Sequence, residues 1–216
     1  MTATRRLLSA SLIALALAGC RGTGDLVVDE SVGITAVRGA CPAVGIPDYT
    51  GDVTLFSTPG STDSRAIDVV ANMTNLRNTC AENTDKVYAG VSFDVQAQRY
   101  DTRGARQVQL PYFVTVLRGG TAVIAKRIGT VTLNFADGQG RAQASAQGGA
   151  FVDRAEATLP ADIRERITRK RKAGDPDAAL DPLADPEVKA AVARATFEVL
   201  VGFQLDQAQI AYNATR

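Results

Sequence analysis

The sequence predicts a mainly β domain, built as an antiparallel β-sandwich with a short helical insertion before the last strand. Three observations indicate this fold. Apolar and polar residues alternate with a period of two in several segments, turn signals recur about every ten residues, and the period changes between residues 160 and 195. The chain has 216 residues, of which 45% are hydrophobic and 22% charged, a composition that suits one modest globular domain.

Residues 1–19 have the features of a signal peptide, because Arg5 and Arg6 precede the apolar run Leu7–Leu17 and small residues follow it. As a helix this run would be about 16 Å long, roughly half of what a bilayer crossing needs. Ordinary cleavage at the small residues, with release of the protein, is one interpretation of this segment.

The second interpretation is lipidation, since Leu17-Ala18-Gly19-Cys20 resembles the bacterial lipobox. The resemblance implies that Cys20 becomes the new N-terminus and carries a diacylglyceryl group and an N-acyl chain, which hold the protein on a membrane. In the enterobacterial sorting pattern an aspartate after this cysteine favours the inner membrane. The chain has Arg21 there, so the resemblance implies the periplasmic face of the outer membrane. Residues 20–40 would then form a glycine-containing tether.

The two remaining cysteines, Cys41 and Cys80, form an even pair in an oxidising compartment, so we expect a disulfide between them. On the chain-entropy model, closing a loop of about 40 residues contributes roughly 4 kcal/mol. The chain has no Cys-x-x-Cys motif and no histidine, which disfavours a redox or metal role.

The domain begins between residues 26 and 41, and its clearest strand is residues 87–100, where odd positions are apolar and even positions polar. Asp101-Thr102-Arg103-Gly104 suits a type I turn into a strand at 106–117. Pro111 indicates an edge or a bulge in that strand. Further strands are expected at 53–57, 67–74, 131–135, 141–147 and 196–205, with Val27-Val28 and Ile34–Val37 as an optional early strand.

The stretch from Ala66 to Asp101 looks like the immunoglobulin-like modules that are common in bacterial envelope proteins. It combines an apolar strand, Asn-Met-Thr-Asn, a long second strand and an Asp-x-x-Gly turn. This resemblance implies only the sandwich architecture, because the chain has no tryptophan for the core position of antibody domains. The alternative is an up-and-down barrel that closes around a lipid-sized cavity.

Residues 160–195 are predicted to form two short helices, since Ile163 and Ile167 have helical spacing and Asp185-Pro186 is a helix start signal. A connection of this length exceeds what a sandwich needs and is the first place to look for function. Its candidate contact residues, for a partner or for phospholipid headgroups, come from a basic run; a solvated helix end is the alternative. These residues are Arg164, Arg169, Lys170, Arg171 and Lys172.

The acidic residues of the insertion resemble a calcium loop only in their density. Asp175, Asp177, Asp181 and Asp185 lack the glycine and the glutamate of an EF-hand, so we interpret them as turn starters and a helix cap and expect no metal.

The absence of histidine excludes Ser-His-Asp and Cys-His catalysis and imidazole metal sites. Without residues 1–19 the chain has 22 basic and 23 acidic residues, so we expect no nucleic-acid partner. We expect a cell-envelope lipoprotein that binds or scaffolds another envelope component, without enzymatic activity or cofactor. The alternatives are a periplasmic carrier of a small apolar ligand and a carboxylate-based hydrolase.

Overall fold

The computed structural model describes residues 39–172, 174–176 and 180–216. Cys20, the lipobox and the optional strand segments within residues 27–37 therefore lie outside the described residues. Of the described residues, 39–170 and 180–216 belong to one compact unit, whereas 171, 172 and 174–176 belong to a second unit.

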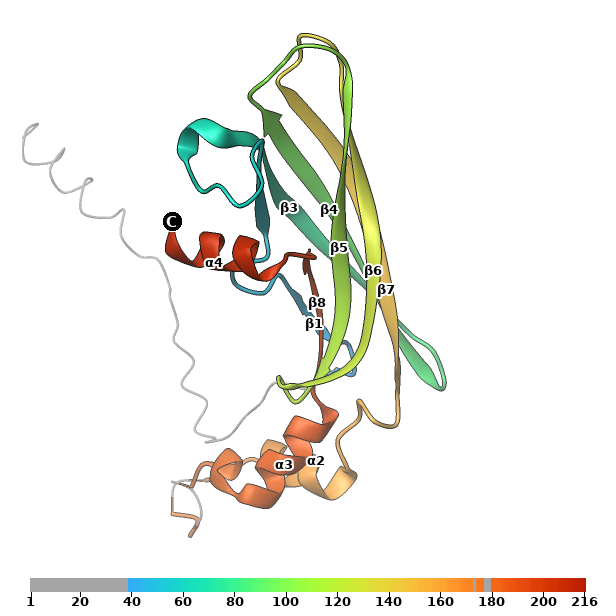
Figure 1. Cartoon of the computed structure of the whole chain (residues 1–216). Coiled ribbons are helices and arrows are strands. Elements are labelled where there is room, and N and C mark those ends of the chain that lie inside the picture. Colours follow the sequence, from blue (N-terminus) through green and yellow to red (C-terminus); the bar gives the residue numbers. More distant parts are fainter. Residues whose placement is uncertain (1–38, 173, 177–179) are drawn as a thin grey trace, which may run out of the picture. The chain divides into compact units, whose positions relative to one another are not determined.

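The strands form two four-stranded sheets (Figure 1). The first sheet has the order β1 (Ala43–Gly45), β8 (Phe197–Phe203), β5 (Arg106–Arg118) and β6 (Ala122–Phe135). The second has the order β2 (Asp52–Phe56), β3 (Ile67–Glu82), β4 (Lys86–Arg99) and β7 (Arg141–Asp153). All neighbouring strands are antiparallel except β1 and β8, which are parallel.

The predicted mainly β, two-sheet architecture is confirmed, whereas the immunoglobulin-like topology is not. In the immunoglobulin arrangement the first two strands share a sheet and the third lies in the other. Here β1 and β2 belong to different sheets, and β2, β3 and β4 are consecutive neighbours in one sheet.

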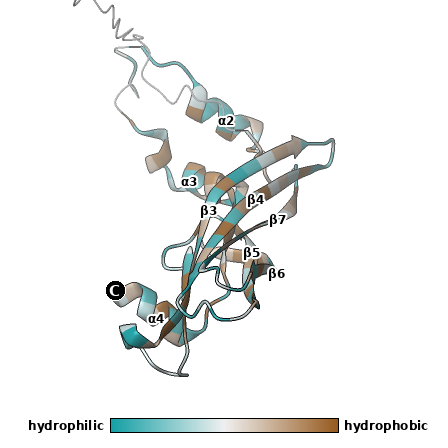
Figure 2. Ribbon diagram, turned by 90° about the horizontal axis from the view of Figure 1, so that it is seen from above, coloured by the Kyte–Doolittle hydropathy of each residue, from teal (hydrophilic) through white to brown (hydrophobic). Residues whose placement is uncertain are grey.

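The core lies between the sheets, and its pattern follows the predicted alternation. On β4 the odd positions from Val87 to Ala97 are buried, including Phe93, which is 1% exposed. Figure 2 shows the hydrophilic and hydrophobic residues alternating along β3 and β4. Alternate residues of β5, from Val108 to Val116, face this layer from the other sheet. The period of two therefore places one face of each sheet in the core.

Pro111 lies inside β5 at the point where the pairing with β8 stops. The register with β8 begins at the next residue, Tyr112, opposite Phe203. The N–H of Gln204 donates to the carbonyl of Pro111 at 2.8 Å. The backbone of Pro111 therefore faces the β8 side beyond the last residue of that strand, where its missing N–H breaks no ladder hydrogen bond.

Three α-helices complete the described part of the chain. α2 (Ala161–Thr168) and α3 (Pro186–Ala195) occupy the predicted insertion, which confirms it as helical. Two short 3-10 turns are η1 (Ser64–Ala66) and η2 (Pro182–Ala184). None of the described helices has the length and apolar character needed to cross a membrane.

The third helix, α4 (Gln207–Thr215), was not expected from the period of the sequence. Tyr212 packs edge-on against Phe56 of β2 with ring centroids 5.2 Å apart. The side-chain amide of Asn213 donates to the backbone carbonyls of Tyr49 and Asp52 at 2.8 and 2.9 Å. α4 thus covers the β2 end of the second sheet.

Candidate functional site

The helical insertion has a small core of its own. Ile163 and Ile167 of α2 are buried against Val188 and Ala191 of α3. The first pair was predicted from its spacing. α2 and α3 therefore pack as a pair and present their remaining side chains on a defined surface.

Asp185 starts α3 in the predicted way. Its carboxylate accepts a hydrogen bond from the N–H of Glu187 at 2.8 Å, and Pro186 occupies the first turn. Asp181 caps η2 through the N–H of Leu183 at 2.8 Å. The interpretation of these aspartates as caps is confirmed, and the described residues contain no group of three or more acidic or cysteine side chains arranged to hold a metal ion.

Contacts with the hairpin between β5 and β6 fix the insertion to the sandwich. The guanidinium of Arg118 donates to the carbonyl of Arg194 at 2.7 Å. The N–H of Gly119 donates to the carbonyl of Thr196 at 2.9 Å. Gly119 has a φ of 63°, which favours glycine, and a Cβ atom there would lie only 3.2 Å from the carbonyl oxygen of Ala193.

The candidate cations do not form one uniform surface. Arg164 and Lys170 are exposed, and Arg169 is the C-terminal cap residue of α2. Arg171 is buried, at 5% exposure, whereas the basic run of the sequence suggested an exposed contact residue there. The side chain of Lys172 is exposed, and its backbone N–H donates to Asp175 at 2.9 Å.

Arg166, in the last turn of α2, is held by acids at the start of α3. It hydrogen-bonds to Glu187 at 2.9 Å and also pairs with Asp185. The hydrogen bond to Glu187, helped by the charge of Asp185, raises the pKa of the Arg166 guanidinium. This cation fastens α2 to the start of α3, so much of its charge is already compensated within the insertion.

An open hollow lies at the end of β7, where the chain leaves the sandwich for α2. Its wall contains Asp85 from the turn after β3, Asp153 from the end of β7, and the neighbouring Arg154. The other lining residues are Thr84, Ala155, Thr158, Leu159 and Pro160. The alternating pattern of the sequence gave no signal for this hollow, because turns and strand ends from distant positions build it.

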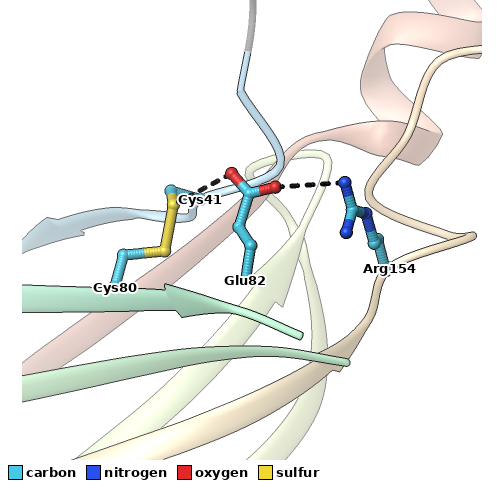
Figure 3. Close-up of a disulfide and its surroundings, with 4 residues drawn as sticks. All are labelled: Cys41, Cys80, Glu82 and Arg154. Carbon is cyan, nitrogen blue, oxygen red and sulfur yellow. Dashed lines mark hydrogen bonds and ion pairs between the residues drawn. A yellow bond between two sulfur atoms is a disulfide. The ribbon is translucent and has the colours of Figure 1, made fainter. Parts of the chain in front are cut away.

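The disulfide between Cys41 and Cys80 is present, as predicted, and lies beside this region (Figure 3). It links the chain before β1, in the first sheet, to β3 in the second. Glu82 lies 3.7 Å from the sulfur of Cys41 and pairs with Arg154 at 3.5 Å. Figure 3 shows the carboxylate of Glu82 between the disulfide and the arginine. The two sheets are thus joined covalently next to the start of the insertion.

Arg99 is a buried side chain that the sequence analysis did not single out. It is 2% exposed and donates at 2.8 Å to four backbone carbonyls. These carbonyls belong to Thr102, Gly104, Ala136 and Gln139, in the turns after β4 and β6. Arg99 therefore organises the far turns of the sandwich, and its role is structural.

Comparisons of this chain with protein-family models, curated proteins and solved structures find no match. Conclusions about function therefore rest on the residues and contacts described above.

Proposed function

We propose that the chain is a lipid-anchored cell-envelope protein that binds another envelope protein, and that it performs no catalysis. The lipobox at Leu17–Cys20 supports the anchor and the expected location on the periplasmic face of the outer membrane. The observation that carries the binding role is the packing of α2 against α3 in the insertion, because these helices have a core of their own and are not needed to close either sheet.

The charges on α2 favour a protein partner over an anionic membrane surface. The helix carries Asp162 and Glu165 as well as Arg164 and Arg166, and Arg166 is compensated by α3. A surface of mixed sign recognises a complementary protein surface, whereas headgroup binding needs a cluster of uncompensated cations.

The carrier hypothesis has less support. The space between the two sheets holds large buried side chains such as Phe93, Leu133 and Phe135. Alanines of β7 at 142, 144 and 146 pack against this core. A carrier of an apolar ligand needs an interior that side chains leave unfilled. The hydrolase alternative has no specific observation in its favour.

The anchor is tested by Cys20→Ser. We expect this variant to lose lipid and to leave the membrane fraction, since the acyl chains supply about 0.8 kcal/mol per buried methylene. Metabolic labelling with a palmitate analogue and fractionation measure both effects. Equal membrane retention of parent and variant would contradict the anchor.

The contact surface is tested by a variant with Arg164→Gln, Lys170→Gln and Lys172→Gln, which spares the paired Arg166 and the buried Arg171. We expect an unchanged melting temperature, because exposed charges contribute within about 0.5 kcal/mol each. We also expect fewer envelope crosslinks formed from a photoreactive residue placed on α2. The matched control removes three exposed cations of the sandwich instead: Arg65→Gln, Arg77→Gln and Arg141→Gln.

Two outcomes contradict this assignment of the surface. Crosslinks that persist in the α2 variant would place the contact elsewhere. Loss of binding to vesicles of phosphatidylglycerol and phosphatidylethanolamine, with protein crosslinks intact, would show that the cations meet lipid headgroups instead.

A further inference from the structure

β6 is the end strand of its sheet and leaves one side of its backbone unpaired. Its residues pair with β5 only, while the neighbouring β7 pairs with β4 in the other sheet. An end strand with unpaired N–H and C=O groups is a template for another extended chain. The free edge of β6 is defined here as residues 122–130.

The orientation of the Pro111 backbone shows which N–H and C=O groups of this edge point away from β5. The carbonyl of Pro111 faces β8, because it accepts from Gln204. Pro111 lies opposite Thr130, and backbone direction alternates along a strand. The N–H and C=O groups of Thr130, Ile128 and Lys126 therefore point away from β5. Within the described part of the chain, no backbone partner outside β5 is recorded for these three residues.

The side chains of the free edge are unusually apolar for an exposed strand. Val123 is 63% exposed, Ile124 50% and Ile128 55%. Strand edges that must remain solitary are normally short, carry charged side chains, contain a bulge or are interrupted by proline. The free edge makes up the first part of a strand of 14 residues and contains no proline, and its only charged side chains are Lys126 and Arg127. Covering it with another strand would remove apolar surface from water.

The charges of β6 indicate which charged side chains an added strand should carry. Lys126 and Arg127 are exposed, and β6 contains no acidic residue. Lys126 lies 5.0 Å from the ring centre of Phe113, and Arg127 is in register with the buried Val114. The two cations therefore project from opposite faces of the sheet. A second copy of β6 would bring like charges together, which destabilises strand pairing, whereas carboxylates in the incoming strand would compensate them.

We propose that the free edge of β6 binds, by strand addition, an extended segment of a partner protein in which carboxylates alternate with apolar residues. This inference goes beyond the proposed function, because it names a second contact surface, apart from the helical insertion, and the chemistry of the segment that it would bind. Main-chain hydrogen bonds to Lys126, Ile128 and Thr130 supply the pairing. The carboxylates of such a segment lie on one face, so either Lys126 or Arg127, whichever shares that face, selects the acidic sequence.

The test uses the mature chain without its lipid and two fluorescent seven-residue peptides, in which valine alternates either with glutamate or with lysine. We expect the glutamate peptide to bind at least tenfold more tightly in fluorescence anisotropy at low salt. Ile128→Pro removes an outward N–H that no strand in the described part of the chain uses, so it should abolish binding while the melting temperature stays close to that of the parent. Ile128→Ala is the matched control, because it shortens the same side chain and keeps that N–H.

Charge reversal gives a second test that does not depend on proline. Lys126→Glu combined with Arg127→Glu should invert the preference, so that the lysine peptide binds more tightly. Equal binding of both peptides, or equal binding by Ile128→Pro and Ile128→Ala, would overturn the inference. A dimer that Ile128→Pro dissociates in analytical ultracentrifugation would overturn it too, because the edge would then bind a second copy. The proposed function fails separately, through the Cys20 and α2 variants.

Discussion

The phenolic hydroxyl of Tyr112 on β5 donates a hydrogen bond to the backbone carbonyl of Gln147 on β7, 2.8 Å away. This contact links the two sheets on the side where β6 and β7 are their end strands. No ladder hydrogen bonds between β6 and β7 are recorded in the described structure. The ring of Tyr112 lies over Gly129 of β6, where a Cβ atom would approach to 2.5 Å. Glycine at this position therefore lets one side chain reach from sheet to sheet.

Tyr112→Phe should lower the free energy of unfolding by about 1 kcal/mol, the net contribution of one ordinary hydrogen bond. The loss stays small because Gln147 is exposed and water can reach its carbonyl. Urea denaturation measures the change. Tyr112→Ala is the reference for the ring itself, which packs against Phe93 at 5.1 Å between centroids and should be worth about 3–5 kcal/mol. Equal losses in the two variants would assign the whole effect to the hydroxyl, against this account.

Removal of the disulfide by Cys41→Ser and Cys80→Ser should cost about 2–4 kcal/mol of unfolding free energy, because the bond closes a loop with a sequence separation of 39 residues. The measurement compares denaturation of the parent with and without reductant. Reductant should not affect the double variant. If the parent proves equally stable with and without reductant, the disulfide does not contribute to the free energy of unfolding.

Arg99→Met should destabilise the sandwich by about 3 kcal/mol, because it leaves several carbonyls of two turns without their charged donor. Arg103→Met is the matched control. Arg103 is exposed and paired with Asp101 at 2.8 Å, so its removal should change stability by no more than about 0.5 kcal/mol. Thermal and urea unfolding of both variants measure these changes. Similar losses of unfolding free energy in the two variants would contradict the role of Arg99 in holding the turns.

Asp94 should make stability depend on pH below neutrality. Hydrogen bonds from Ser145 at 2.6 Å and Asn75 at 2.8 Å lower the pKa of this carboxyl in the folded chain. A lowered folded pKa stabilises the protein above the unfolded pKa of about 3.9 and ceases to do so as pH falls through the folded value. Parent and Asp94→Asn should thus differ in stability at pH 6 and converge between about pH 4 and pH 2. A difference between parent and Asp94→Asn that stays constant from pH 6 to pH 2 would contradict a lowered pKa of Asp94. In a Ser145→Ala background the difference at pH 6 should be smaller, because one of the two hydrogen bonds to the carboxylate is missing.

The long strands were predictable because burial on one face leaves a period of two, as in residues 87–100. The first half of β6 was not, since Ala122–Ile128 is exposed on both faces and carries no alternation. β3 extends beyond the expected end at Thr74 for the same reason. It also contains an irregularity near Asn75, which has a φ of 52°. Such strands are held by their neighbours rather than by their own pattern.

The sequence contains a local signal for α4 that hydrophobic periodicity alone does not reveal. Asp206 and Gln209 form a reciprocal capping box at its start, which is visible in the sequence as an aspartate followed three residues later by glutamine. The role of Arg99 had no such signal. A buried arginine cannot be distinguished from an exposed one before the turns around it are placed. The hollow beside Asp85 and Asp153 depends in the same way on long-range folding.

The Cys41–Cys80 bond also determines how the domain would bear mechanical load. A pull applied to the chain before Cys41 reaches Cys80 directly, so the segment between the two cysteines cannot be drawn out even if β1 detaches from its three partners in β8. Part of the force enters β3 along its axis and is resisted in shear by the long ladder with β4. The β1–β8 ladder, with three residue pairs the shortest in the first sheet, is thereby bypassed by the covalent link from Cys41 to Cys80.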